Sequence, residues 1–210
     1  MALLWPFSVG VVNMNRILRV GKPAPFFGAK AVFKGSLRFV RLSDFRGRYL
    51  VLFFYPRDFT KVCPTEVIAL NERVEDFKKL DCDVLACSTD SEFSHIAWMK
   101  APRRCGGLGQ MNIPILADTA HQIAQDYNVY DPDHGLALRG VFIIDRSSIL
   151  RQIIINDLQI GRNVDEVLRL VQAYRHTDDY GEMCPANWKP GCLTIDPHPD
   201  QCIEYFTKTG

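Results

Sequence analysis

One stretch of the sequence limits the fold of this chain more than any other, because it joins an apolar run, a short loop and a cysteine followed by proline. Residues 50–55 read LVLFFY and lack a 3.6-residue period, which is typical of a strand buried on both faces in a parallel or mixed sheet. Pro56 ends this run, and Pro64 directly follows Cys63. Proline is tolerated in the first turn of a helix, and apolar residues recur at helical spacing as far as Leu80. The sequence therefore predicts a buried strand, a loop at its carboxyl end and a helix that begins at Cys63.

The position of Cys63 at a helix start has a chemical consequence. The first turn of a helix leaves backbone N–H groups unpaired and carries a partial positive charge, which favours an anion. A cysteine is nucleophilic only as the thiolate, and helix N-termini and neighbouring cations favour that form. The alternative is an inert cysteine that packs as a small hydrophobe. The residues favour a reactive Cys63 but leave both interpretations open.

Composition and charge exclude several classes of protein. The chain has 210 residues, of which 47% are hydrophobic, and a formal net charge of +1, so we expect one domain with a real core and no nucleic-acid partner. Seven cysteines are an odd number, and the chain is too long to need a disulfide scaffold, so we expect reduced thiols. No CxxC pair occurs, and we expect no metal and no cofactor.

The remaining pattern alternates strands with helices. After a glycine- and proline-rich lead-in with a first hairpin, we expect further strands at residues 82–88, 113–116, 139–145 and 149–155, and helices at 91–100, 119–127 and 164–174. This alternation predicts an α/β fold with a mixed sheet. After Arg175 the sequence becomes rich in proline and glycine, which predicts an extended tail. Trp188, Ile195, Tyr205 and Phe206 give this tail apolar anchors.

The same pattern divides the chain into three parts. Residues 1–18 form an N-terminal extension, residues 19–176 the domain, and residues 177–210 a C-terminal arm. The apolar part of the extension is too short to cross a bilayer and no charged segment precedes it, so a signal peptide is a weak interpretation. Arg16 and Arg19, with no acid before Asp44, leave a mitochondrial presequence open. We expect a cytoplasmic protein without a membrane partner, and a mitochondrial one if residues 1–18 act as a presequence.

Several motifs together resemble one known family. Pro56, Thr60 and Cys63 form a PxxxTxxC arrangement that is similar to the active-site loop of the peroxiredoxins. The resemblance continues through GGLG at 106–109, RGVFIID at 139–145, the segment 150–173, GEMCPANWKPG at 181–191 and Tyr205-Phe206. These stretches cover roughly residues 20–208 and include the markers of the typical two-cysteine subgroup. The resemblance implies a thioredoxin-like α/β fold with a central mixed sheet flanked by helices and an extended C-terminal arm.

The resemblance also implies a reaction. Cys63 would be the peroxidatic cysteine, which attacks a hydroperoxide and becomes a sulfenic acid, and Cys184 the resolving cysteine, which converts that acid into a disulfide. In the subgroup the tail that carries the resolving cysteine reaches the active site of the partner subunit, so a homodimer with intersubunit Cys63–Cys184 disulfides is implied. A thioredoxin-like reductant then restores both thiols. The cellular role would be antioxidant defence and redox homeostasis.

Supporting roles are implied for five further residues. Arg139 and Thr60 match the family's hydrogen-bond donors to the peroxide, and Pro56 shields the site from water. Glu66 and Arg151 match a pair that orients the site. The interpretation from the residues alone is that each arginine is a solvent-exposed charge at a strand edge.

Three expectations concern assembly and regulation. Dimers of the family stack into rings of ten or twelve subunits, and the sequence does not choose between them. GGLG and Tyr205-Phe206 resemble features that pack a C-terminal helix over the active site in members sensitive to overoxidation, so we expect a sensitive enzyme. Arg57 and Lys61 depart from the family pattern. They add two cations beside Cys63, which either favour the thiolate or face solvent, and Lys61 replaces an aromatic residue, which weakens the expectation of ring formation.

Two other functions compete with the peroxidase. A holdase chaperone or redox relay can coexist with it, and differs because a Cys63→Ser variant would keep holdase activity. A thiol–disulfide oxidoreductase is disfavoured because CxxC is absent.

Overall fold

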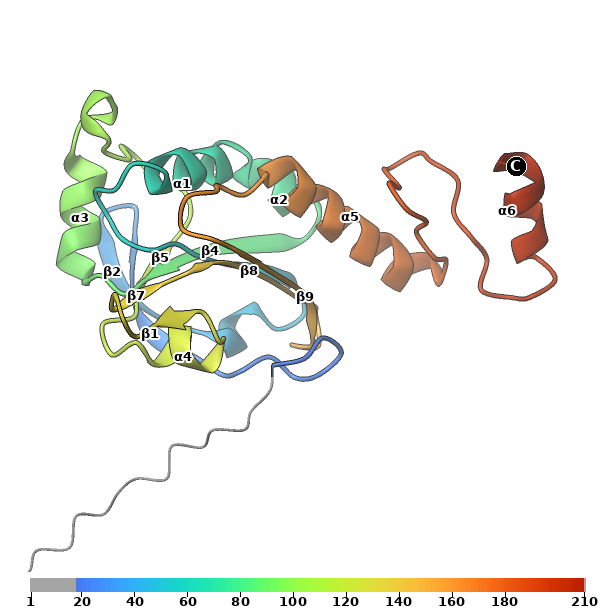
Figure 1. Ribbon diagram of the computed structural model, residues 1–210, viewed down its shortest axis with the longest axis horizontal. Coiled ribbons are helices and arrows are strands. Elements are labelled where there is room, and N and C mark those ends of the chain that lie inside the picture. Colours follow the sequence, from blue (N-terminus) through green and yellow to red (C-terminus); the bar gives the residue numbers. More distant parts are fainter. Residues whose placement is uncertain (1–17, 210) are drawn as a thin grey trace, which may run out of the picture.

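The structure is a computed structural model that describes residues 18–209. A seven-stranded sheet in the order β2-β1-β5-β4-β3-β8-β9 forms its centre (Figure 1). The strands of this sheet are β1 Gly28–Phe33, β2 Ser36–Arg41, β3 Tyr49–Phe54, β4 Cys82–Ser88, β5 Ile115–Ala117, β8 Arg139–Ile144 and β9 Leu150–Asn156, and a separate ribbon pairs β6 Tyr130–Asp131 with β7 Leu136–Ala137. The helices are α1 Cys63–Glu72, α2 Val74–Lys79, α3 Glu92–Lys100, α4 Gln122–Asp126, α5 Val164–Tyr180 and α6 Cys202–Thr209, with short 3₁₀ helices at Leu42–Phe45 and Arg103–Cys105.

The sheet is mixed, as the sequence predicts. β3 pairs parallel with β4, and β4 pairs parallel with β5. β8 runs antiparallel to β3, and β9 antiparallel to β8. The register of β3 and β4 places Phe54 beside Cys87, so the carboxyl ends of both strands meet at one edge. The loop that leads to Cys63 starts at this edge.

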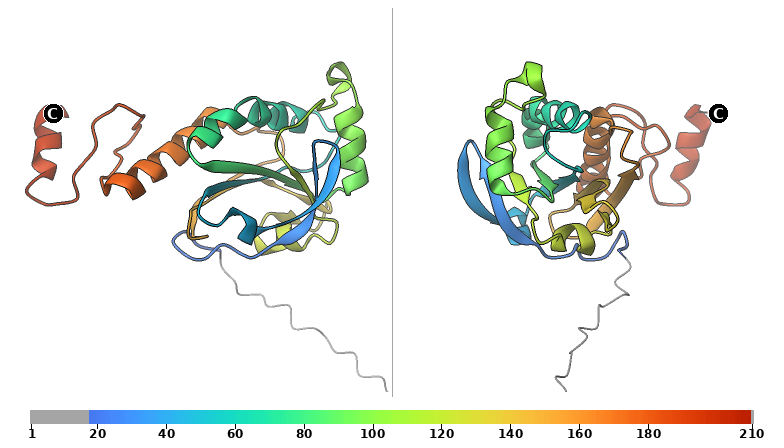
Figure 2. Two further views of the ribbon diagram at one scale, coloured as in Figure 1. Left: turned by 180° about the vertical axis from the view of Figure 1, so that it is seen from behind. Right: turned by 60° about the vertical axis from the view of Figure 1, so that its left-hand side comes forward.

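The central strand β3 is apolar along its whole length because both of its faces are covered. All six of its residues are buried. Tyr49, Val51 and Phe53 pack into a core cluster with residues of α1, α2 and α5, whereas Leu50, Leu52 and Phe54 join a second cluster with residues of α4. In Figures 1 and 2, α1, α2 and α5 lie over one face of the sheet and α4 over the other. The α/β fold with flanking helices is thus confirmed.

Several predicted bounds are wrong, for local reasons. The helix that begins at Cys63 does not run unbroken to Leu80, because Arg73 has φ −101° and ψ 5° and separates α1 from α2. The helix near residues 119–127 is shorter than predicted, since His121 precedes it with φ 60°. The helix predicted for 164–174 instead continues to Tyr180, where Gly181 ends it in the left-handed conformation.

The C-terminal arm is more ordered than the composition of the tail predicts. Figures 1 and 2 show it extending from the carboxyl end of α5, away from the sheet, and ending in α6. Met183 and Ile195 exchange two backbone hydrogen bonds of 2.8 and 2.9 Å. Trp188 is only 3% exposed, and its carbonyl accepts a 2.8 Å hydrogen bond from Arg169 on α5. The first half of the arm therefore folds back on α5.

Two parts of the predicted domain division remain predictions. The extension assigned to residues 1–18 lies, apart from Leu18, outside the described residues. The boundary after residue 176 falls inside α5, which ends at Tyr180. Among residues 18–209, no helix is both long and apolar enough to cross a membrane.

Candidate active site

Cys63 is the first residue of α1, directly after the loop that leaves β3. Pro64 follows it in the first helical turn, where a proline costs nothing because that N–H has no intrahelical partner. The side chain of Cys63 is fully buried. The N–H groups of Thr65 and Glu66 are occupied by the carbonyl of Val62, at 3.0 and 3.3 Å. Direct hydrogen bonds to the sulfur must therefore come from outside the helix.

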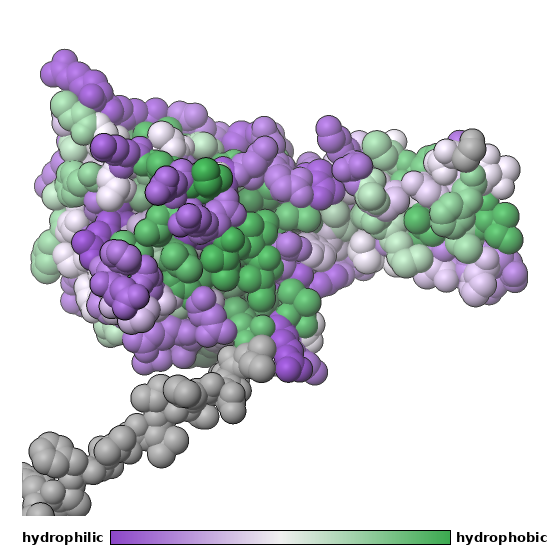
Figure 3. Space-filling view, in the orientation of Figure 1, coloured by the Kyte–Doolittle hydropathy of each residue, from purple (hydrophilic) through white to green (hydrophobic). Residues whose placement is uncertain are grey.

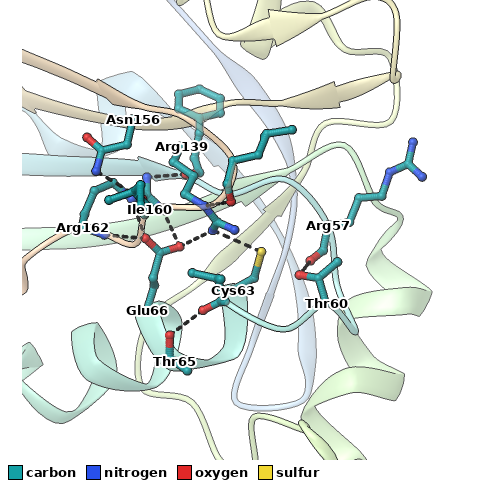
Figure 4. A network of polar contacts seen from close by, with 12 residues as sticks. Arg57, Thr60, Cys63, Thr65, Glu66, Arg139, Asn156, Ile160 and Arg162 are labelled. Atoms are coloured by element: carbon teal, nitrogen blue, oxygen red, sulfur yellow. Dashed lines mark hydrogen bonds and ion pairs between the residues drawn. The ribbon is translucent and has the colours of Figure 1, made fainter.

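A network of buried charges supplies such a donor (Figure 4). Arg139, at the start of β8, directs Nη1 at the Sγ of Cys63 over 3.4 Å and at the Oε2 of Glu66 over 2.5 Å. Its Nε donates to the carbonyl of Leu158 over 2.6 Å. Glu66 lies one helical turn after Cys63, so both side chains project from the same face of α1. The guanidinium is thereby fixed against the sulfur.

Arg162 completes the network from the loop before α5. Its Nε and Nη2 donate to the two carboxylate oxygens of Glu66 over 2.8 and 2.9 Å. Its Nη1 donates to the carbonyls of Phe54 and Gly140 over 2.5 and 2.8 Å, and its guanidinium lies over the ring of Phe53. Burial lowers the pKa of Arg162, and its hydrogen bonds to Glu66 oppose that shift. The guanidinium can remain buried because Glu66 and two backbone carbonyls accept its hydrogen bonds.

The charges of this network do not cancel. Two guanidinium groups face one carboxylate, and Arg139, Arg162 and Glu66 are each less than a tenth exposed. Such a surplus of positive charge is expensive to bury unless an anion offsets it. A thiolate at Cys63 would make the site neutral. The arrangement thus favours a nucleophilic sulfur.

Thr60 and Pro56 belong to the loop in front of Cys63. Pro56 is buried, and Thr60 is exposed. The hydroxyl of Thr60 donates to the carbonyl of Arg57 over 3.0 Å, so its lone pairs are left to accept a hydrogen bond from a ligand. Below the loop, Asp58 contacts the ring of His95 over 2.8 Å and accepts from the hydroxyl of Tyr55 over 2.8 Å.

The predicted pairing of Glu66 with Arg151 is wrong. Arg151 lies on β9 and forms ion pairs with Asp145 at 3.3 Å and Asp178 at 2.9 Å. The partner of Glu66 is Arg162, which the sequence reasoning missed. The chain holds a usable signal beside it: a Cβ atom at Gly161 would lie 3.3 Å from Val62 and 3.5 Å from Glu66. A glycine directly before this arginine lets the loop approach α1 closely.

Cys184 lies in the arm, half-buried against α5. Its Sγ contacts the carbonyl of Ala173 at 3.7 Å and the hydroxyl of Thr177 at 3.8 Å. In Figures 1 and 2 the arm projects beyond the end of α5, while α1 lies over the sheet. All seven cysteines are free thiols. The structure thus does not bring Cys63 and Cys184 of one chain together.

The other residues of the sequence analysis are placed as follows. Lys61 is exposed, and the side chain of Arg57 points away from Cys63 in Figure 4. Cys82 and Cys87 are buried in β4, where burial raises the pKa of both thiols. Within residues 18–209, no three His, Cys, Asp or Glu side chains are grouped as a metal site.

Comparison with known proteins agrees with this geometry. The model of the AhpC/TSA family matches residues 20–153, and that of the C-terminal domain of 1-Cys peroxiredoxin matches residues 173–208. Peroxiredoxin-2 of Macaca fascicularis is 58% identical over 190 residues, which are 90% of this chain and 96% of that protein. Peroxiredoxin-4 of Bos taurus is 56% identical over 190 residues, which are 90% of this chain and 69% of that protein.

Solved structures give the same result. The crystal structure of the reduced 2-Cys peroxiredoxin of Plasmodium vivax superposes with a TM-score of 0.87 and 42% identity, covering 90% of this chain and 98% of that one. The mitochondrial 2-Cys peroxiredoxin of Plasmodium falciparum gives a TM-score of 0.76 and 41% identity, covering 80% of this chain and 100% of that one. The chain therefore belongs to the peroxiredoxin family, within its typical two-cysteine subgroup, and is a thiol peroxidase.

Proposed function

We propose that Cys63 is the cysteine that carries out the peroxidase reaction. One observation carries this proposal: the buried Sγ of Cys63 lies 3.4 Å from the guanidinium of Arg139 at the start of a helix. The thiolate attacks one oxygen of a hydroperoxide, the O–O bond breaks, and the leaving alkoxide or hydroxide takes a proton. The products are a Cys63 sulfenic acid and an alcohol or water.

The neighbouring residues divide the electrostatic work. Arg139 stabilises the thiolate and the negative charge that develops on the peroxide oxygens. Thr60 accepts a hydrogen bond from the peroxide O–H rather than donating one as the resemblance implied, because its own proton is held by the carbonyl of Arg57. Glu66 and Arg162 keep Arg139 in position, and Pro56 excludes water at the end of β3. Arg151 has no part in this arrangement.

We propose that Cys184 of a second subunit resolves the sulfenic acid. A disulfide needs Cα atoms within about 7 Å, and the arm leads away from the body of its own chain (Figure 2). Attack of the Cys184 thiol on the sulfenic sulfur forms the disulfide and releases water. A thioredoxin-like dithiol then returns both cysteines to the reduced state by exchange.

The edge strand β9 supports a homodimer. β9 is the last strand of the sheet, so one row of its backbone groups lacks a partner strand within the described chain. Figure 3 shows apolar side chains gathered over this region, where Ile155 is 43% and Ile160 62% exposed. A second copy that pairs with this edge would cover them. Sizing experiments in both redox states distinguish dimers from a ring of ten or twelve subunits.

Three variants, compared with the wild type, test the proposed chemistry. Peroxide consumption is followed with thioredoxin, thioredoxin reductase and NADPH for the wild type, Cys63→Ser and Cys184→Ser, with Cys82→Ser as a control for a buried cysteine elsewhere. We expect no turnover by Cys63→Ser. We expect Cys184→Ser to consume one equivalent of peroxide and then stop with thioredoxin as reductant. Turnover that survives Cys63→Ser would refute the mechanism.

A holdase activity is a second candidate. It is favoured by α6, on which Ile203 is 61% and Phe206 59% exposed. Suppression of the aggregation of a heated client protein should be retained by Cys63→Ser. If Cys63→Ser lost this suppression as well as its peroxidase activity, a separate function would be excluded.

For the compartment we propose the cytoplasm, with the mitochondrion as the alternative if residues 1–18 act as a presequence. Fractionation of cells that express the full chain, with and without residues 1–18, distinguishes them.

A further inference from the structure

Arg57 joins two segments that meet at the active site. Its Nη2 donates to the carbonyl of His134 over 2.5 Å, so its side chain reaches the turn between β6 and β7. Its own carbonyl accepts the hydroxyl of Thr60 over 3.0 Å. One residue therefore connects the loop that precedes Cys63 to a turn far along the sequence.

The turn that receives Arg57 is itself well fixed. The N–H of Gly135 donates to the carbonyl of Asp131 over 2.9 Å, and the carboxylate of Asp131 contacts the ring of His134 over 2.7 Å. Thr89, after β4, donates to the carbonyl of Gly135 over 3.3 Å. Beyond this turn the chain forms β7 and reaches Arg139 two residues later. Arg57 thus fastens the loop in front of Cys63 to the segment that supplies Arg139.

This connection matters because Cys63 cannot form a disulfide in the observed conformation. Its side chain is 0% exposed, whereas two bonded sulfur atoms must approach to about 2.05 Å. The loop and the first turn of α1 must therefore move before another sulfur can reach Cys63. The observed closed conformation contains a hydrogen bond between that loop and the fixed turn. A movement of the loop that breaks this bond is opposed by it, so the bond would shift the equilibrium towards closure.

We propose that Arg57 controls how the Cys63 sulfenic acid is partitioned between disulfide and sulfinic acid, a proposal that rests on the function proposed above. In the open conformation, the sulfenic acid and the Cys184 thiol give a disulfide and water. In the closed conformation, the sulfenic acid and a second hydroperoxide give a sulfinic acid and an alcohol or water. By favouring closure, Arg57 slows the first reaction and gives the second more time.

The expected effect is modest and has a definite direction. Replacing Arg57 by methionine removes the tether but keeps the carbonyl that holds Thr60, so the reaction of Cys63 with the first peroxide should persist. We expect disulfide formation to become about threefold faster, which is about 0.7 kcal/mol at 1.4 kcal/mol per tenfold. This matches the small net contribution of one exposed hydrogen bond. The fraction of sulfinic acid at a fixed peroxide dose should fall accordingly.

The test uses the full-length protein in its reduced form. Samples are mixed with peroxide, quenched with a thiol-blocking reagent at successive times, and analysed by mass spectrometry for sulfenic, sulfinic and disulfide forms of Cys63. The variants are Arg57→Met, Arg57→Lys, which keeps a shorter donor, and Lys61→Met. Lys61 is the matched control, because it is an exposed cation of the same loop for which the described residues provide no side-chain hydrogen bond.

The expected order of disulfide formation is Arg57→Met fastest, Arg57→Lys intermediate, and Lys61→Met equal to the wild type. Equal rates for Arg57→Met and the wild type would overturn the tether. So would an equal effect of Lys61→Met, because loop charge rather than the contact with His134 would then be responsible. A wild type that forms neither sulfenic acid nor disulfide would refute the proposed function instead.

Discussion

The buried partner of Glu66 offers the sharpest test of the active-site geometry. Replacing Arg162 by methionine keeps an apolar stem of similar length but removes the guanidinium. Four side-chain hydrogen bonds are then lost, two to Glu66 and one each to the carbonyls of Phe54 and Gly140. The backbone N–H of residue 162 still donates to Glu66 over 2.8 Å. The carboxylate of Glu66 therefore stays buried, and Arg139 is the cation of this network that remains to balance its charge.

The structure gives the magnitude of two effects. Breaking a buried ion pair by removing one partner costs about 3–5 kcal/mol, which for a chain of this size lowers Tm by about 10 °C. Glu66 would also attract Arg139 more strongly and loosen its contact with the Sγ of Cys63. Hydrogen bonds to charged groups contribute about 1.5–3 kcal/mol. We therefore expect the rate of Cys63 oxidation to fall by about tenfold to a hundredfold.

Arg151→Met is the matched control, because it makes the same substitution at an arginine of β9, the strand that precedes the loop with Arg162. Arg151 is paired with Asp145 and Asp178 near the surface, with 22% of its side chain exposed, and such pairs contribute about 0–1 kcal/mol. Calorimetry measures Tm, and stopped-flow mixing with peroxide measures the oxidation rate. An Arg162→Met protein with unchanged stability and rate, or an Arg151→Met protein with the larger loss of rate, would refute the reasoning.

Three further predictions follow from other parts of the chain. Gly107→Ala places a Cβ atom 1.9 Å from the carbonyl oxygen of Ala101, so we expect urea unfolding to show a loss of about 1–3 kcal/mol, and a neutral result contradicts it. Hydrogen bonds, that of Thr194 foremost, hold the pKa of Glu182 below its usual 4.5. A lowered carboxyl pKa stabilises the fold above the unfolded value and ceases to do so as pH falls through the folded one. The protection of the arm's amides, measured as their exchange rate relative to the intrinsic rate at each pH, should therefore fall below about pH 4.5, and protection that is constant with pH argues against this anchor. Ile155→Lys should yield monomers in light scattering, since the charge lies on the exposed part of β9, and intact dimers would exclude that edge as the interface.

Local sequence signals were sufficient for the centre of the fold. The unbroken apolar run at residues 50–55 reflects a strand that is covered on both faces, and this requirement is visible in the sequence because no polar side chain can occupy either face. Pro64 marks the start of α1 at Cys63 for a similar reason, since proline fits only the first turn. Burial on both faces and helix initiation depend on neighbouring residues, which makes them predictable.

The electrostatic partners of the site were not predictable in this way. Arg151 and Arg162 lie eleven positions apart on consecutive segments of the chain. Only the path of the loop before α5, which approaches α1 at Gly161, decides that Arg162 reaches Glu66. The break between α1 and α2 at Arg73 and the docking of Trp188 on α5 depend likewise on packing between distant elements.

The sequence by itself thus determined the strand, the loop and the helix start that place Cys63, because these follow from the periodicity and conformational limits of adjacent residues. Only the tertiary structure decided that Arg162, and not Arg151, joins Glu66 and Arg139 beside that sulfur. Ion pairs form between groups whose separation in space is set by the whole fold. Both pairs join an arginine to a carboxylate, and it is burial that makes the pair of Glu66 and Arg162 strong and the more exposed pair of Arg151 and Asp178 weak.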